Sequence, residues 1–167
     1  MRRLATQLVS SGVVIASTFM VWELVILLAG CEPPIAVVYH GSMGPAFRKG
    51  DILWLQKNQA PVPIGEIVVF KVNEESAPIV HRVITVHQRR DTGEVSLLTK
   101  GDNNSEDDRG GTYTEGRLWL TLDQVYGRVR WYWPYLGRVI IWVAMERYIK
   151  YPVIGAVVMY LLASKKP

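Results

Sequence analysis

The chain has 167 residues, which fits one domain with appendages and leaves little room for a second domain. Its hydrophobic fraction of 49 %, its charged fraction of 20 % and its mean hydropathy of +0.11 exclude a disordered chain and favour contact with lipid. The net charge of +4 is spread along the sequence, so we expect no nucleic-acid partner. A single cysteine excludes an internal disulfide and a structural zinc site, and we expect neither a metal nor a cofactor.

The first expected element is a membrane-spanning helix from Leu8 to Gly30, because this almost uncharged run has about the 20 residues that a span needs. Glu23 is the ionisable residue inside the run, and a carboxylate there requires a partner subunit or a position near the membrane interface. Arg2 and Arg3 before the run and Glu32 after it favour a cytoplasmic N-terminus, with the rest of the chain on the far side.

Two processing signals share features with this segment. A basic start and an apolar run also describe a secretory signal, and the sequence from Leu28 to Cys31 resembles a bacterial lipoprotein cleavage site. However, the run exceeds the roughly 7–15 residues of a signal core, and Glu23 would lie inside that core. We therefore expect a retained anchor.

Between Ile35 and Arg130, short β-branched runs separated by proline, glycine and asparagine predict an all-β domain. The expected strands run from Ile35 to Tyr39, Ile52 to Gln56, Glu66 to Val72, Ile79 to His87, Val95 to Thr99 and Gln124 to Val129. The predicted fold is therefore mainly β, with an N-terminal transmembrane helix and a short apolar helical segment near the C-terminus.

A glycine-flanked turn after the first strand holds Ser42 in the sequence His40-Gly41-Ser42-Met43-Gly44-Pro45. A serine exposed on such a turn, with a base nearby, is an activated nucleophile. The spacing does not match the Gly-x-Ser-x-Gly elbow and no helix pattern follows, so an α/β-hydrolase is excluded. The alternative is an ordinary turn.

His81 is one of three histidines, with His40 and His87, that can supply a base at neutral pH. Strand alternation predicts that His81 shares one face with Ile79, Val83, Thr85 and His87. An imidazole among such neighbours is partly desolvated. It is either a catalytic base or a core side chain bonded to a carbonyl.

An acidic loop follows Lys100. It does not match the hand-type calcium loop, because the sixth and twelfth positions are Asp107 and Tyr113 instead of glycine and glutamate. The loop instead offers carboxylates to orient an imidazole, with Glu106 and Asp107 expected in a solvated turn. Asn103-Asn104-Ser105 also matches the N-glycosylation pattern.

Two further apolar stretches, from Val139 to Ala144 and from Val153 to Ala163, are each too short to span a membrane alone. We expect buried, re-entrant or interfacial elements there. Aromatic residues cluster from Trp131 to Tyr151, as they do at the lipid headgroup level, although Trp131 to Tyr135 also suits the edge of a protein core.

Several motifs occur in one order and together carry a family resemblance. They are Gly41-Ser42-Met43 followed by Pro45, Arg48-Lys49-Gly50-Asp51, the run from Gly65 to Phe70, the run from Ile79 to Val83, and the run from Lys100 to Asn104. The chain resembles the catalytic subunits of the endoplasmic-reticulum signal peptidase complex, and the motifs extend through most of its length.

The resemblance implies a signal-peptidase-like β domain and a membrane-bound serine endopeptidase that cleaves signal peptides from preproteins. It implies that Ser42 is the nucleophile, that His81 is the general base in place of the lysine of bacterial relatives, and that Asp108 and Asp102 support the base. Either aspartate is a candidate for the bond to the imidazole. The backbone N–H of Ser42 is the natural oxyanion donor.

The same resemblance implies a single-pass protein of the endoplasmic-reticulum membrane with a cytoplasmic N-terminus and a luminal catalytic domain. The expected division is an anchor over residues 1–31, the catalytic domain over 32–137 and a membrane-associated segment over 138–167. The expected partners are signal peptides, accessory membrane subunits and the lipid bilayer.

Two residues depart from the family pattern. His40 replaces the serine that helps to bind the oxyanion in bacterial relatives, and Gly44 replaces a glutamate. Losing one oxyanion donor costs about 10²–10³ in rate, although an imidazole N–H can donate in its place. The alternative function is therefore a catalytically weak homologue that acts as a structural or substrate-binding subunit. A self-cleaving repressor-type hydrolase would use lysine and need no anchor, and the run from Leu8 to Gly30 contradicts that reading.

Overall fold

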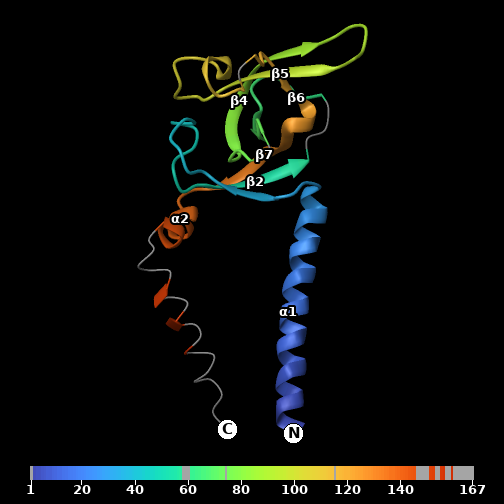
Figure 1. The fold of residues 1–167 in the computed structure, drawn as a ribbon, viewed down its shortest axis with the longest axis vertical. Coiled ribbons are helices and arrows are strands. Elements are labelled where there is room, and N and C mark those ends of the chain that lie inside the picture. Colours follow the sequence, from blue (N-terminus) through green and yellow to red (C-terminus); the bar gives the residue numbers. More distant parts are fainter. Residues whose placement is uncertain are drawn as a thin grey trace.

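The computed structural model describes residues 2–57, 61–73, 75–114, 116–145, 151–152, 155–156 and 159. A long helix, α1 (Arg2–Ala29), extends away from a β domain (Figure 1). A shorter helix, α2 (Gly137–Met145), leaves the domain on the same side (Figure 1). The described chain therefore consists of one β domain with both helices at one end.

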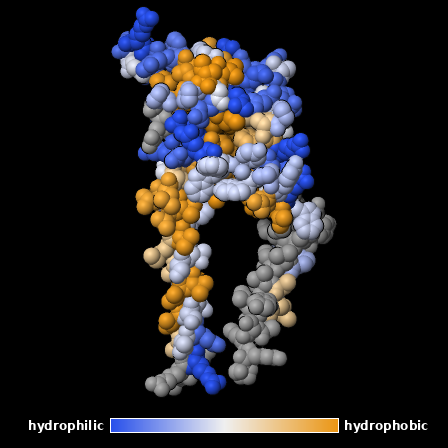
Figure 2. Space-filling view, turned by 180° about the vertical axis from the view of Figure 1, so that it is seen from behind, coloured by the Kyte–Doolittle hydropathy of each residue, from blue (hydrophilic) through white to orange (hydrophobic). Residues whose placement is uncertain are grey.

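Helix α1 confirms the predicted apolar span. The stretch Ala5–Ala29 has 25 residues, or about 37 Å of helix, which exceeds the roughly 30 Å of a hydrocarbon core. Its side chains are largely exposed, and Figure 2 shows apolar residues along its length. The helix ends at Ala29, because the next residue, Gly30, has a φ of 67°. The Gly30 N–H still donates to the Ile26 carbonyl.

The β domain is a single sheet of seven strands in the order β1-β2-β7-β3-β4-β5-β6, with every neighbouring pair antiparallel. The strands are β1 (Ile35–Val37), β2 (Ile52–Lys57), β3 (Ile67–Phe70), β4 (Ile79–Gln88), β5 (Val95–Lys100), β6 (Leu120–Thr121) and β7 (Val125–Trp133). All six predicted strands are confirmed. The prediction lacked β6, because two residues give no alternation to detect.

Two hydrophobic clusters lie on opposite faces of β3. Val68 and Phe70 belong to one cluster, whereas Val69 between them belongs to the other, as strand alternation requires. The second cluster includes Met43 and Phe47, which follow Ser42 in the chain. The turn that holds Ser42 is therefore anchored in the core.

A β-bulge in β4 breaks the predicted alternation. The register to β5 shifts between Val83 and Thr85, so Ile84 is an extra residue. Before the bulge, His81 and Val83 are buried as predicted. After it, Val86 packs against the core, while His87 is exposed. The prediction that Thr85 and His87 share the face of His81 is therefore wrong.

The end of β7 and the start of α2 form a surface of exposed apolar side chains. Its members are Trp131, Tyr132, Trp133, Tyr135, Leu136, Val139, Ile140 and Trp142. Their exposure contradicts the interpretation of Trp131 to Tyr135 as the edge of a protein core. The second predicted apolar stretch, Val153 to Ala163, lies largely outside the described residues.

Candidate active site

The turn after β1 presents the Ser42 hydroxyl. Backbone hydrogen bonds close the turn, from the Gly44 N–H to the Gly41 carbonyl at 3.1 Å and from the Phe47 N–H to the Met43 carbonyl at 3.0 Å. The Met43 side chain is fully buried, so the residue after Ser42 is fixed. This anchoring holds the hydroxyl in a constant direction.

Ser42, His81 and Asp108 form a continuous chain of hydrogen-bonding groups. The Ser42 Oγ lies 3.2 Å from His81 Nε2, and His81 Nδ1 lies 2.7 Å from Asp108 Oδ2. His81 is 4 % exposed and Asp108 is completely buried. When Nδ1–H donates to the carboxylate, Nε2 is left to accept the Ser42 proton, which is the arrangement of a nucleophile with an oriented base.

Packing fixes the His81 ring as well. In the sheet, His81 of β4 pairs with Val68 of β3. The His81 ring packs edge to face against the Phe70 ring, with the ring centres 6.2 Å apart. Asp108 begins the short 3₁₀ helix Asp108–Gly110, and its own carbonyl accepts from the N–H groups of Thr112 and Tyr113. Strand β4 and this turn thus bring together two residues that are 27 positions apart.

Asp102 has a different partner. Its carboxylate accepts from Arg82 Nε at 2.8 Å and Nη2 at 2.7 Å. The Arg82 guanidinium holds the pKa of Asp102 below its usual value. Of the two candidate aspartates, Asp108 bonds to the imidazole, and Asp102 ties the loop after β5 to the residue that follows His81.

The loop after β5 also contacts the nucleophile. The Asn103 N–H donates to the Ser42 carbonyl at 2.8 Å. A Cβ on Gly101 would lie 2.7 Å from the Ser42 carbonyl oxygen and 2.9 Å from His81 Nε2. Only glycine leaves room for this approach of the backbone to the Ser42 carbonyl and the His81 ring.

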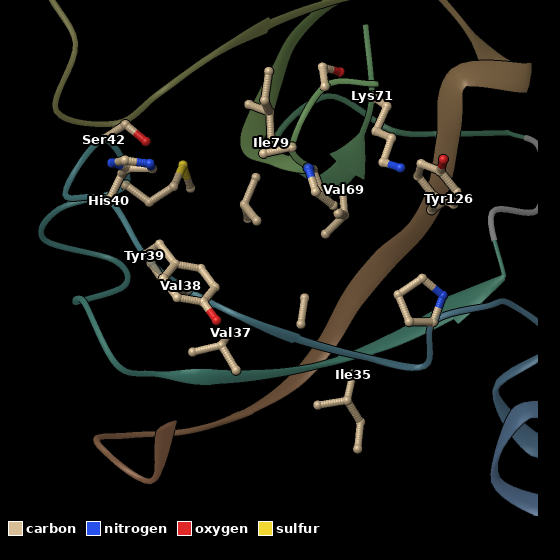
Figure 3. Close-up of a pocket in the computed structure, with 17 residues that line it drawn as sticks. Ile35, Val37, Val38, Tyr39, His40, Ser42, Val69, Lys71, Ile79 and Tyr126 are labelled. Atoms are coloured by element: carbon tan, nitrogen blue, oxygen red, sulfur yellow. The ribbon is translucent and has the colours of Figure 1, made fainter. Parts of the chain in front are cut away.

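Ser42 lies at one end of an apolar groove of about 650 Å³. The segment from Ile35 to His40 lines one side, and Val69, Ile79 and Val80 line the other. His40 lies beside Ser42, whereas Lys71 and Tyr126 lie at the opposite end (Figure 3). The size is typical of a ligand site. A groove of this kind admits an extended chain and presents it to the hydroxyl.

The remaining polar residues of the acidic loop lie apart from the histidine. Asp107 accepts from the Arg109 N–H at 3.0 Å and caps the 3₁₀ helix, and Glu106 is exposed. His87 packs beside Trp119 with ring centres 5.6 Å apart. The positions of Glu106 and Asp107 agree with the expected solvated turn.

Sequence reasoning missed two hydroxyls at this site. Thr99 and Tyr113 are buried and bonded to one another, and Thr99 donates to Asp108 Oδ2. A signal was present, because alternation along β5 puts Thr99 on the same face as Val95 and Leu97. A polar residue on an otherwise apolar face, just before the acidic loop, marks a buried hydrogen bond.

The fold and this site define a serine hydrolase that carries a helix long enough to cross a membrane. No family model matches the chain. The signal peptidase complex catalytic subunits SEC11C of Homo sapiens and Rattus norvegicus are each 44 % identical to it over 166 residues, which cover 99 % of this chain and 85 % of theirs. The catalytic subunit sec11 of Dictyostelium discoideum is 37 % identical over 98 % of this chain and 90 % of its own length. The chain belongs to the family of signal peptidase complex catalytic subunits, as its motifs predicted.

Proposed function

We propose that this protein removes N-terminal signal peptides from preproteins, as the serine endopeptidase of a signal peptidase complex. The observation that carries the proposal is the buried chain from Ser42 through His81 to Asp108 at the end of an apolar groove. Family membership supports the substrate class, because the relatives are named as catalytic subunits of that complex.

In the proposed reaction, His81 Nε2 takes the hydroxyl proton while Ser42 Oγ attacks the carbonyl carbon of the scissile peptide bond. The imidazolium then gives this proton to the leaving amine, and the new chain is released. Water attacks the acyl-serine in the same way, with His81 as its base, and frees Ser42. Asp108 keeps its charge and stabilises the imidazolium.

The oxyanion formed on the substrate needs hydrogen-bond donors. The Ser42 backbone N–H lies at the nucleophile and is the first proposed donor. His40 lies beside Ser42 at the same end of the groove (Figure 3). We assign its ring N–H as the second donor, in the place where bacterial relatives use a serine hydroxyl.

The substrate's cleavage segment is proposed to bind as an added strand. Strand β1 is at the edge of the sheet, and β2 is its partner among the described residues. The free edge of β1 lines the groove that ends at Ser42. Extended peptides bind such edges through main-chain hydrogen bonds, and the apolar walls select small side chains before the cut.

The proposed topology places residues 1–31 as the anchor, 32–137 as the luminal catalytic domain and 138–167 at the membrane. It assigns a cytoplasmic N-terminus in the endoplasmic-reticulum membrane and accessory membrane subunits as partners. The exposed aromatic and aliphatic side chains at the end of β7 and on α2 support lipid contact. Helix α2 also leaves the domain on the same side as α1 (Figure 1).

Cleavage of a preprotein by the assembled, detergent-solubilised complex tests the proposal. We expect wild type to cleave and Ser42→Ala to be inactive. Asp108→Asn should lose at least about 10³-fold in rate, because the imidazole loses the charge that stabilises its protonated form. The cleavage rate of His40→Ser, compared with wild type, measures how much the oxyanion donor at position 40 contributes to catalysis. Cleavage by Ser42→Ala at the wild-type rate would overturn the assignment, and an inactive, assembled wild type would favour a structural subunit.

A further inference from the structure

Two buried hydroxyls, those of Thr99 and Tyr113, extend the hydrogen-bonded chain beyond Asp108. Thr99 at the end of β5 is completely buried, and Tyr113 is 7 % exposed. Thr99 Oγ1 lies 2.5 Å from Asp108 Oδ2 and 2.8 Å from the Tyr113 hydroxyl oxygen. The Thr99 backbone N lies 3.0 Å from the same phenol oxygen. The chain of contacts therefore continues beyond the Ser42–His81–Asp108 set.

The direction of each bond in this extension is fixed. A backbone N–H only donates, so the Tyr113 oxygen accepts from Thr99 N. The phenol proton is then directed to Thr99 Oγ1, and the Thr99 proton is directed to Asp108. Burial raises the pKa of Tyr113, which keeps this proton on the phenol at neutral pH.

Both hydrogen-bond donors to the Asp108 carboxylate donate to the same oxygen atom. Oδ2 accepts from His81 Nδ1 and from Thr99 Oγ1, whereas Oδ1 is buried and has no hydrogen-bond partner among the described residues. A buried carboxylate keeps its charge only through donated hydrogen bonds and opposite charges. Thr99 therefore supplies a second neutral hydrogen bond to this carboxylate, beside that from His81 Nδ1–H.

We propose that Thr99 and Tyr113 are positioning residues for the cleavage reaction, which hold the Asp108 carboxylate aimed at His81 Nδ1. The inference deepens the proposed function and rests on it. Thr99 acts on the carboxylate, and Tyr113 acts through Thr99 by fixing the direction of its hydroxyl. Neither residue touches the substrate.

The first experiment compares Thr99→Val and Thr99→Ser in the assembled complex. Valine keeps the shape and removes the hydroxyl, so kcat should fall by about 10–100-fold with KM within about twofold of wild type. Serine should restore most of the rate. Thr121→Val is the matched control, because it removes the hydroxyl of a threonine on β6 that bonds to Gln124 and not to Asp108. A Thr99→Val enzyme with the wild-type kcat would overturn the proposal.

The pH profile separates positioning from a merely structural role. Without the Thr99 donor, Oδ2 carries more negative charge and stabilises the His81 imidazolium more strongly. The acidic limb of kcat/KM should therefore move to higher pH by about half a unit or more. The other charged groups near His81 and Tyr113 among the described residues are Asp102, Asp107 and Arg109. Arg82 and Lys100 lie near Asp102, and all variants retain these five groups. An unchanged acidic limb would contradict the proposal.

A measurement without cleavage distinguishes this inference from the proposed function. The chain has three histidines, so their ¹³C-labelled ring signals can be resolved by NMR. Thr99→Val should shift the His81 ring signals at neutral pH, because Thr99 and His81 share one oxygen of Asp108, and should leave the His87 signals unchanged. This result stands whether or not the complex cleaves a preprotein, whereas an unmoved His81 would overturn the role of Thr99.

Tyr113→Phe completes a double-mutant cycle with Thr99→Val. If Tyr113 acts only through the Thr99 hydroxyl, the phenylalanine should lower kcat in the threonine background and have little further effect in the valine background. Independent losses that multiply in the double variant would remove Tyr113 from the positioning pair. Thermal unfolding should show that every variant is folded, so that their kcat values can be compared.

Discussion

At the scale of single residues, Gly101 shows how closely the backbone surrounds the reacting groups. Gly101 lies between the Ser42 carbonyl and the His81 ring. A Cβ on this residue would lie closer than 3.0 Å to both groups, which is too close for any side chain. The Ser42–His81 contact at 3.2 Å therefore depends on a residue that contributes no side-chain chemistry.

Gly101→Ala should lower kcat by about 100-fold, because separating nucleophile and base by as little as about 1 Å has that cost. KM should change little, since the groove is untouched. Steady-state cleavage by the assembled complex checks this. Gly12→Ala is the matched control, because no atom lies within 4 Å of a Cβ built there, and it should cleave like wild type. Equal kcat values for the two variants would refute the spacing argument.

Asp102 contributes to stability in a pH-dependent way. Arg82 lowers the pKa of Asp102, so the folded state favours the ionised carboxylate. This stabilisation is present above the unfolded pKa of about 3.9 and is lost as pH falls through the folded value. The pair is partly exposed, and after solvent screening it is worth about 1 kcal/mol.

Asp102→Asn should therefore lower the thermal unfolding midpoint at pH 7 by a few degrees, and the difference should shrink below about pH 4. Thermal unfolding of the detergent-solubilised protein at both pH values measures this. Asp91→Asn, in an exposed pair with Arg89, serves as the control and should change the midpoint little. A midpoint difference that is constant with pH would contradict the linkage.

At the scale of elements, β1 joins the sheet to the groove. The Val38 N–H donates to the Asp51 carbonyl, and the Pro34 carbonyl accepts from the Leu55 N–H, so the polar groups of these residues face β2. Alternation then turns the Val37 N–H toward the free edge. This group is available to a substrate strand.

Val37→Pro removes that free N–H while leaving the bonds to β2 intact. If the substrate pairs with β1, KM should rise by about five- to tenfold relative to Val37→Ala, which is the loss of about one hydrogen bond. Val37→Ala is the matched control for the side chain, which packs at the start of α2. Steady-state cleavage gives both constants, and equal KM values would exclude main-chain pairing at this residue.

At the scale of the whole molecule, the groove connects the apolar helix to the nucleophile. Ala29 ends α1, β1 begins at Ile35, and Ser42 follows in the next turn. A site so close to α1 in the chain lies next to the membrane surface when α1 spans the bilayer. A signal peptide is itself an apolar helix followed by a short extended segment, so the same arrangement suits its cleavage site.

The proposed topology predicts that the tip of the β4–β5 hairpin is luminal. Arg90→Asn creates an Asn-x-Thr acceptor with Thr92 at this exposed tip. In microsomes, the variant should gain one glycan relative to wild type, seen as a mobility shift that endoglycosidase removes. Arg90→Gln, which creates no acceptor, is the control. A variant that gains no glycan would contradict a luminal catalytic domain.

The apolar helix, six of the seven strands and the types of residue at the site could be predicted from the sequence alone. An almost uncharged run longer than 20 residues and a two-residue alternation are local patterns, and local backbone preferences follow from them directly. The order of the motifs around Ser42, His81 and the acidic loop also sufficed for the family. By contrast, the two residues of β6 carry no pattern, and the expected alternation past Ile84 failed because a bulge depends on the partner strand.

The aspartate that bonds to the histidine could be identified only from the folded structure. Asp102 and Asp108 are close in sequence and alike in chemistry, and the choice depends on how a loop folds against strand residues 20 or 27 positions away. The 3₁₀ turn at Asp108 directs its carboxylate inward, whereas Arg82 binds Asp102. The hydroxyls of Thr99 and Tyr113 became visible for the same reason, because hydrogen bonds between distant segments are fixed by packing and not by local preference.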